Sequence, residues 1–172
     1  MWPPGVSLPL HWGRHLLLTD SVMNTLLMSI AAVLAGLLVV LLALALWSRF
    51  GQAPGLVNGR LAPCPGTPNC VCSEAGTAST HAIAALPLPS DGLVGLRTAI
   101  EAEGGRVAVA QGDYLAASFR SALFGFVDDL EIRIDRAAGV AQVRSAARVG
   151  YSDGGVNSRR VEALRGRLAA GK

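Results

Sequence analysis

The chain contains one long apolar run, and this run constrains the fold more than any other feature. It extends from Leu26 to Trp47 and lies in a stretch without charged residues between Asp20 and Arg49. About 20 apolar residues are enough to cross a hydrocarbon core of about 30 Å. A single small domain cannot surround so uniformly apolar a helix. The run therefore predicts a transmembrane helix over residues 24–48, with Trp47 as an interfacial anchor.

A cleaved signal peptide is the alternative interpretation of this run. Signal peptides usually have an apolar region of about 7–15 residues behind a basic start. This run is longer, and no Lys or Arg directly precedes it, although Ala43-Leu44-Ala45 matches a cleavage site. Residues 1–23, which contain three prolines, are expected to form a disordered leader.

The rest of the chain predicts a linker followed by one domain. Residues 49–60 are rich in Gly and Pro, and residues 61–172 are enough for a single modest core. The net charge of +3 is uneven, because residues 51–143 carry six basic and nine acidic side chains, whereas residues 144–172 carry seven and two. This cationic end favours anionic partners. A solvated, Arg-rich helix face is equally compatible with the pattern.

Two segments of the domain have helical periodicity. Ser90 or Asp91 would cap a helix that continues to about Glu103, where a Gly-Gly pair ends it. A second helix is expected from about Asn157 to Leu168, and Asn157 or the following serine would cap it.

Four strand-like segments lie between these helices. The clearest is Val127–Asp135, in which Leu130, Ile132 and Ile134 alternate with charged residues that are expected to face solvent. Short connections predict neighbouring antiparallel strands. The domain is therefore expected to be α+β: a helix, a four-stranded antiparallel meander and a helix. The expected strands are Arg106–Ala110, Tyr114–Ser121, Val127–Asp135 and Val140–Ala146. The positions expected to face outward on the third strand are Asp129, Glu131, Arg133 and Asp135.

A loop rich in Pro and Cys precedes these elements. Two prolines and a glycine between Cys64 and Cys70 fold the segment back, which favours a disulfide between them and an oxidising compartment. Cys72 would then be a free thiol. The alternative is a zinc site, because these three cysteines and His81 form a three-Cys, one-His set. The spacing matches none of the usual zinc pairs, so neither a metal nor another cofactor is expected.

The stretch from Arg144 to Arg160 is the strongest candidate for a functional site. Two of its arginines, Arg159 and Arg160, would lie in the first turn of the last helix, where the macrodipole disfavours a cation by about 0.3–1 kcal/mol. An internal clasp of arginines and nearby aspartates would offset this cost. An anion held by the helix N–H groups, Gly154-Gly155 and the arginines would do the same. The candidate ligand-binding residues are Arg144, Arg148, Tyr151, Asp153, Asn157, Arg159 and Arg160, with Asp128 and Asp129 in support.

Known catalytic patterns fit the chain poorly. Adjacent Asp128 and Asp129 would point to opposite faces of a strand, so they cannot act together on one substrate. A Cys72–His81 nucleophile would lack an oxyanion hole, and the chain has neither a Gly-x-Ser-x-Gly elbow nor a Walker loop. Nucleic acid is not an expected partner, because Tyr151 is the only aromatic platform in the cationic stretch.

Several motifs, taken together and in order, resemble the bacterial and plastid family catalogued as domain of unknown function 1499, from Gly59 to Leu168. They are Cys64-Pro65, Pro68-Asn69-Cys70-Val71, Phe124-Gly125-Phe126-Val127-Asp128-Asp129, Arg144-Ser145, Arg148-Val149-Gly150-Tyr151-Ser152-Asp153, and Asn157 with Arg159-Arg160. Many members of that family resemble envelope lipoproteins, which implies a domain on the outer face of the inner membrane. No cysteine precedes Cys64 here, so the transmembrane helix is expected to replace the lipid. Ser usually stands at the position of Cys72, which argues against an essential role for this thiol.

The sequence thus predicts a single-pass inner-membrane protein with a periplasmic domain. Its expected role is non-enzymatic binding of an anionic ligand, such as a lipid headgroup or phosphorylated small molecule, or of an envelope protein. The alternative is a hydrolase or transferase that acts on a phosphorylated or lipid-linked envelope substrate. An acid–base group close to the arginines would favour that alternative.

Overall fold

A computed structural model describes residues 11–171, with side chains from residue 21 onward, and contains an apolar N-terminal helix, α1 (His11–Ser48). Its segment Ser21–Ser48 has a mean hydropathy of 2.9 and is long and apolar enough to cross a membrane. The helix includes residues 11–23, for which we predicted a disordered leader; residues 1–10 lie outside the described part. The apolar helix itself is confirmed, as either a membrane anchor or a signal sequence.

The chain divides into two compact units between Leu42 and Ala43, so the last turn of α1 belongs to the same unit as the domain. The predicted linker contains a small hairpin, β1 (Leu56–Val57) and β2 (Arg60–Leu61). Asn58 and Gly59 form its turn with φ of 51° and 74°. Asn-Gly is the preferred sequence of such turns because both residues tolerate positive φ.

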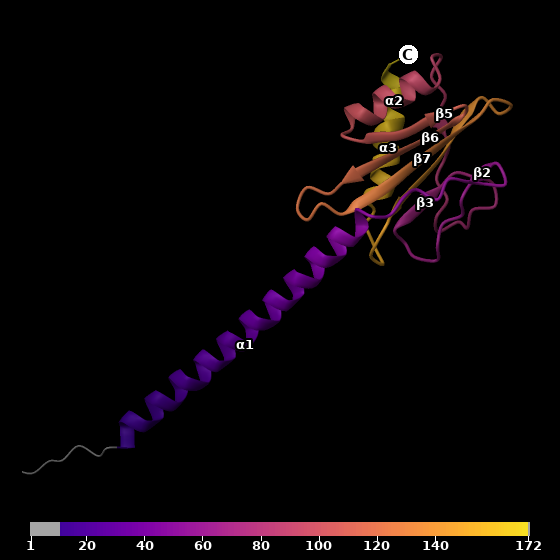
Figure 1. The fold of residues 1–172 in the computed structure, drawn as a ribbon. Coiled ribbons are helices and arrows are strands. Elements are labelled where there is room, and N and C mark those ends of the chain that lie inside the picture. The colour runs from indigo at the N-terminus through magenta and orange to yellow at the C-terminus, as the bar shows by residue number, and fades with distance from the viewer. Residues whose placement is uncertain (1–10, 172) are drawn as a thin grey trace, which may run out of the picture. The chain divides into compact units, whose positions relative to one another are not determined.

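The domain has the expected α+β architecture, built on a six-stranded sheet (Figure 1). The predicted meander is confirmed and the strand order is β3-β8-β7-β6-β5, with β4 also paired to β8. The two short strands β3 and β4 were not predicted. The strands are β3 (Cys70–Cys72), β4 (Leu86–Pro87), β5 (Arg106–Gln111), β6 (Tyr114–Arg120), β7 (Val127–Asp135) and β8 (Val140–Ala147).

Both domain helices, α2 (Leu93–Ala102) and α3 (Val156–Ala170), pack on one face of the sheet (Figure 1). The side chains of Leu130, Ile132 and Ile134 of β7 point into the core between the sheet and these helices, as the alternation predicts. The predicted cap of α2 was wrong: Gly92 occupies the N-cap position and no side chain binds the free amides there.

At β7 the opposite face of the sheet is largely covered, and this corrects the prediction that the charged residues of β7 face solvent. Glu131 is fully buried and Asp129 is 5% exposed. Residues 55–74 cross this face, and the Gly55 amide donates a hydrogen bond of 2.8 Å to Glu131. The charged side chains of β7 therefore line a buried polar layer.

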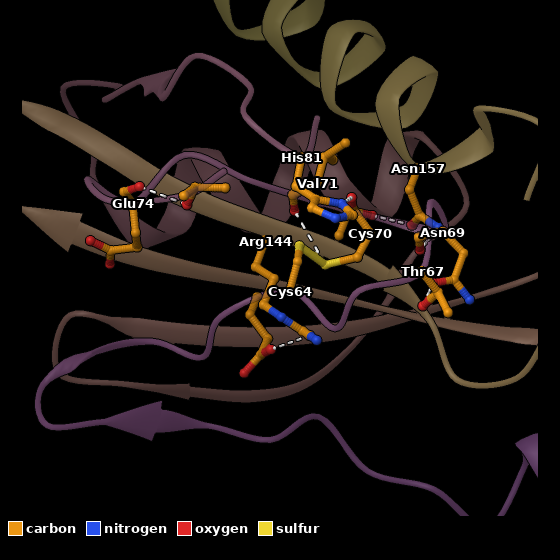
Figure 2. Close-up of a disulfide and its surroundings, with 12 residues drawn as sticks. Cys64, Thr67, Asn69, Cys70, Val71, Glu74, His81, Arg144 and Asn157 are labelled. Carbon is orange, nitrogen blue, oxygen red and sulfur yellow. Dashed lines mark hydrogen bonds and ion pairs between the residues drawn. A yellow bond between two sulfur atoms is a disulfide. The ribbon is translucent and has the colours of Figure 1, made fainter. Parts of the chain in front are cut away.

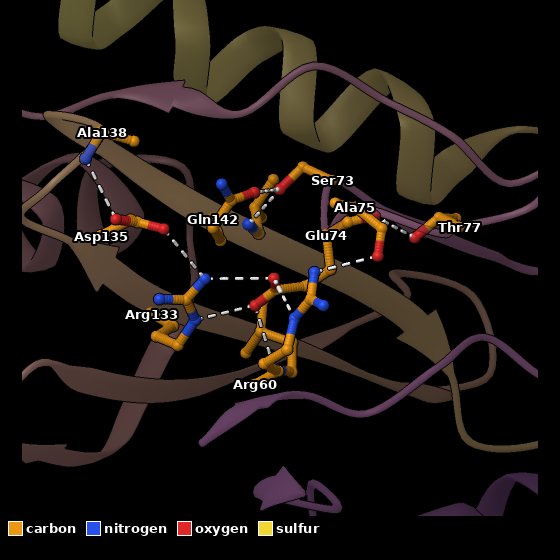
Figure 3. Close-up of polar contacts among 11 residues, drawn as sticks. Arg60, Ser73, Glu74, Ala75, Thr77, Arg133, Asp135, Ala138 and Gln142 are labelled. Atoms are coloured by element: carbon orange, nitrogen blue, oxygen red, sulfur yellow. Dashed lines mark hydrogen bonds and ion pairs between the residues drawn. The ribbon is translucent and has the colours of Figure 1, made fainter. Parts of the chain in front are cut away.

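Glu74 binds two arginines within this layer (Figure 3). Arg133 donates to both of its carboxylate oxygens, at 2.8 and 3.1 Å, and Arg60 donates at 3.1 Å. The Leu61 amide is a further donor. Burial alone would raise the pKa of Glu74, but these hydrogen bonds hold the pKa below its usual value. Glu74 thereby fastens the β2 segment to the sheet.

Candidate functional site

The predicted disulfide between Cys64 and Cys70 is confirmed and closes the loop in front of β3 (Figure 2). Cys72 is a free, buried thiol. His81 donates a hydrogen bond of 3.0 Å from its Nδ1 to the Cys70 carbonyl. Because two of the three cysteines are bridged, the predicted alternative of a three-Cys, one-His zinc set does not form. Within residues 21–171, no other group of His, Cys, Asp and Glu is arranged to hold a metal.

A cavity of about 460 Å³ lies beside this loop and is open to solvent. Cys72, Glu74 and His81 contribute to its walls, together with the β1–β2 hairpin. Its charged groups are already paired, since Glu74 binds Arg60 across it. The cavity therefore contains His81 as an acid–base group, but its one arginine, Arg60, is already paired.

Asp128 and Asp129 bind different arginines on opposite faces of the sheet, as adjacent strand residues must. On the helix side, Arg160 donates to Asp128 at 2.7 Å. On the other side, Arg148 forms a two-pronged pair with Asp129, at 2.9 and 2.7 Å. Planar guanidinium and carboxylate groups match in such pairs, which fixes their orientation as well as their distance.

Arg148 also binds the C-terminal end of α1. Its Nη1 donates a hydrogen bond of 3.0 Å to the carbonyl of Ser48. The hydroxyl of Ser48 accepts a hydrogen bond of 3.1 Å from the Val127 amide, and Ser48 is completely buried. The last carbonyls of a helix lack partners within the helix and carry partial negative charge, so a cation stabilises them. Arg148 thus joins the start of β7 to the end of α1.

Asn157 is the centre of the hydrogen-bond network on the helix side. Its side-chain oxygen accepts from Ser145 at 2.5 Å and from Arg160 at 2.6 Å. Its amide nitrogen donates to the Asn69 carbonyl at 3.2 Å and to Asp153 at 2.8 Å. Asn157 is 1% exposed, so water does not reach its side chain and Asn157 supplies the hydrogen bonds that water would otherwise make to these groups.

Arg160 is held from two further directions. Its guanidinium lies over the ring of Phe119, 4.4 Å from the centroid, in a cation–π contact. It also donates to the Ser145 hydroxyl at 3.1 Å. These contacts offset the cost of placing a cation near the N-terminal end of α3, where Arg160 is the fifth residue.

Asp153 caps α3, which corrects the prediction that Asn157 or Ser158 does so. Its two oxygens accept hydrogen bonds from the Gly155 amide at 2.9 Å and the Asn157 amide at 2.8 Å. Burial would raise the pKa of Asp153, but these hydrogen bonds hold the pKa below its usual value. The chain's own carboxylate therefore occupies the amides that we had considered for an external anion.

Arg144 belongs to the buried polar layer and pairs with Glu131 at 3.0 Å. The hydroxyl of Tyr114 donates to the same carboxylate at 2.7 Å. Burial and this hydrogen bond raise the pKa of Tyr114. Among the described side chains, the Nε of Arg144 is a buried polar atom without a partner.

Tyr151 and Arg159 lie outside these networks. The ring of Tyr151 is 72% exposed, and Arg159 is exposed, with one hydrogen bond of 2.8 Å to the Gly154 carbonyl. The structure thus places the seven candidate residues in three groups: a helix-side network, two ion pairs with Asp129 and Glu131 on the opposite side, and two exposed residues.

Sequence reasoning missed four residues that complete these groups. Asn69 binds the Gly150 carbonyl through its side chain at 2.6 Å, which joins the disulfide loop to the β8–α3 loop. Ser48, Phe119 and Glu131 provide the contacts described above. The signal for Asn69 was its place between Pro68 and Cys70, where a buried polar side chain is expected to bind backbone.

The geometry of the fold and its loops can now be compared with known proteins. The model of the family described as "Protein of unknown function (DUF1499)" matches residues 60–168. Comparisons with curated proteins and with solved structures give no match. The matched region includes the disulfide, the buried polar layer and all the networks around Asn157. Because it covers more than half of the chain, the protein belongs to the DUF1499 family.

Proposed function

We propose that this protein is a non-enzymatic, single-pass inner-membrane protein whose periplasmic domain binds an anionic ligand. The arginines support this proposal because they divide into two classes. Nine form an ion pair with a carboxylate. Four exposed ones, among the side chains that the structure describes, form none; they are Arg49, Arg106, Arg120 and Arg159.

These four unpaired arginines share one end of the domain. Arg106 begins β5 and pairs in register with Ser118, close to Arg120 at the end of β6. Arg159 is in the first turn of α3, next to Arg160, which binds Asp128 at the start of β7. Arg49 follows the end of α1, which binds Val127. The carboxylates at this end, Asp128, Asp129 and Asp153, are already engaged, so its exposed surface is cationic.

The groups around the arginines favour binding over catalysis. Both oxygens of Asp153 accept backbone hydrogen bonds. His81 binds Cys70 in the disulfide loop, and among the described side chains no hydrogen bond joins it to Arg144, Arg148 or Arg160. A hydrolase or transferase would need an acid–base group next to the substrate phosphate, and the carboxylates here are committed to structure.

The binding proposal predicts that substituting three unpaired arginines weakens anion binding more than substituting three paired arginines does. The full chain, in nonionic detergent, is passed over glycerol phosphate coupled to agarose. Each exposed charge contact contributes about 0.2–1 kcal/mol, so replacing Arg106, Arg120 and Arg159 by Gln should weaken retention roughly tenfold. Replacement of Arg97, Arg136 and Arg167 by Gln is the matched control, because it removes the same charge from exposed, paired positions. If both triple variants elute together, retention reflects net charge and the binding surface is wrong.

The location is tested with a surface thiol. The disulfide supports an oxidising compartment, and the apolar helix supports membrane anchorage. Thr80 is exposed, so a Thr80→Cys variant in a Cys72→Ser background should react with a membrane-impermeant maleimide in intact spheroplasts. The Cys72→Ser variant alone should stay unlabelled. Labelling only after lysis would place the domain in the cytoplasm.

A further inference from the structure

Three large apolar side chains beyond the span, and Trp47 one residue before its end, are highly exposed. Leu123 is 81% exposed, Phe50 80%, Trp47 75% and Tyr151 72%. Burying such side chains is favourable by about 25 cal/mol per Å², so their exposure calls for an explanation. All four lie at the end of the domain that carries the unpaired arginines.

Strand topology places them there. The loop with Leu123 joins the end of β6 to the start of β7, and Tyr151 follows the end of β8. In an antiparallel meander these points share one end of the sheet. The turns at the other end carry Asp113 and Arg136, which pair with each other. We refer to the four apolar residues and the four unpaired arginines together as the α1-end surface.

Direct contacts tie this surface to the end of α1. Val127, which closes the loop of Leu123, binds the Ser48 hydroxyl, and the guanidinium of Arg49 lies close to Gly125. At ~3.5 Å per residue, Leu123 is at most about 14 Å from Val127 along the chain. Ser48 is the last residue of the candidate span. When α1 crosses a bilayer, Ser48 lies at the lipid–water interface, and this surface lies next to it.

We propose that the α1-end surface docks on the bilayer that holds α1. Leu123, Phe50, Trp47 and Tyr151 would enter the headgroup region, and Arg49, Arg106, Arg120 and Arg159 would bind anionic lipid headgroups. Trp and Tyr at the interface, apolar side chains below and arginines around them form the usual pattern of interfacial anchoring. A lipid surface is favoured over a protein partner because the span brings the bilayer to this surface without a separate encounter.

This inference rests on the proposed function and identifies its anionic ligand as lipid headgroups. Hydrogen bonds already hold the backbone at this end of the domain in place. Arg148 and Asp129 fix the end of α1, and Asn157 fixes the adjoining loops. Docking would therefore order little additional backbone, which lowers its entropic cost.

The test uses the full chain in vesicles of phosphatidylcholine and phosphatidylglycerol, with an environment-sensitive fluorophore on a Leu123→Cys variant in the Cys72→Ser background. Spin-labelled lipids quench a fluorophore that enters the bilayer interface. We expect quenching at position 123 and none for a Val109→Cys control, an exposed apolar site of β5. Each anionic headgroup contact contributes about 1 kcal/mol, so replacing Arg106, Arg120 and Arg159 by Gln should lower the docked-to-undocked ratio about fivefold per arginine.

A fluorophore at position 34 distinguishes a failure of the membrane-anchor proposal from a failure of the lipid-docking proposal. Leu34 lies inside the span, so a Leu34→Cys label should be quenched by acyl-chain spin labels. If it is not quenched, the anchor in the proposed function is wrong. If Leu34 is quenched and Leu123 is not, the anchor holds and lipid docking is wrong. A label at Leu123 that is unquenched by lipid yet shielded from iodide in native membranes would also refute lipid docking, in favour of a protein partner.

Discussion

Replacing Glu131 by Gln is expected to lower the free energy of unfolding of the domain by about 3 kcal/mol or more. Glu131 is completely buried and is the carboxylate partner of Arg144, whose side chain is 9% exposed. The substitution keeps the size of the side chain and leaves the guanidinium without a counter-charge. Removing one partner of a buried ion pair is far more costly than removing both. Denaturant unfolding of the full chain in detergent, followed by circular dichroism, measures the effect.

Two further variants separate this explanation from a general loss of stability. In a Glu131→Gln, Arg144→Met double variant no unpaired charge remains, so part of the lost stability should return. Glu101→Gln removes an exposed carboxylate that lies 3.9 Å from Arg97 and should cost less than about 1 kcal/mol. A Glu131→Gln variant as stable as Glu101→Gln would mean that the layer does not depend on this ion pair.

Replacing Asn157 by Ala is expected to destabilise the domain by about 3 kcal/mol. The substitution removes four hydrogen bonds at a position that is 1% exposed. It leaves the Ser145 hydroxyl, the Asn69 carbonyl and the Arg160 guanidinium with fewer partners, and buried polar groups that lose a partner cost about 1–3 kcal/mol each. The remaining hydrogen bonds of Arg160 and Asn69 limit the total. Thermal and denaturant unfolding of the full chain measure it.

Ser158→Ala is the matched control for Asn157→Ala. It replaces the next residue of α3, which is only partly buried, and should change the stability by less than about 0.5 kcal/mol. The Asn157→Ala variant should also free the β8–α3 loop, so proteolysis between residues 148 and 156 should become faster. Equal stability of the two variants would show that the network around Asn157 contributes little.

The elements that the sequence predicted well have long periodic patterns. The apolar helix can be recognised from composition alone, and β7 shows seven residues of strict alternation, from Asp129 to Asp135. By contrast, β3 contains three residues and β4 two, which is too short for any period to appear. The β1–β2 hairpin did have a signal, Asn58-Gly59, but the surrounding Gly and Pro favoured a linker.

The prediction that the charged face of β7 is exposed to solvent was wrong for a different reason. Alternating charges are the pattern of a strand with one wet face, and also of a strand that lines a buried polar layer. The difference lies in residues 55–74, which cover Glu131, and no local pattern in β7 reports a segment so distant in sequence. Opposite charges at Glu131 and Arg144, which are neighbours in the register, were the available hint.

The sequence indicated residues of the candidate site but not which of them contact one another. Arg148 and Arg160 of this stretch do bind Asp129 and Asp128, so the structure contains an internal clasp, whereas Tyr151 and Arg159 lie outside it. The sequence could not assign Arg160 to Asp128 and Arg148 to Asp129, because a long guanidinium side chain reaches many positions and strand register decides between them. The contact with Ser48 spans 100 residues and had no local signal.

The burial of Cys72 bears on how the Cys64–Cys70 disulfide forms and persists. Three cysteines allow three different single disulfides, and two of them involve Cys72. Once β3 pairs with β8, the Cys72 thiol is 1% exposed and neither an oxidant nor a disulfide-exchange enzyme can approach it. Cys70 is itself only 2% exposed, so the Cys64–Cys70 bridge has to form before the loop closes over β3, and the assembled sheet then keeps Cys72 from exchanging with that bridge.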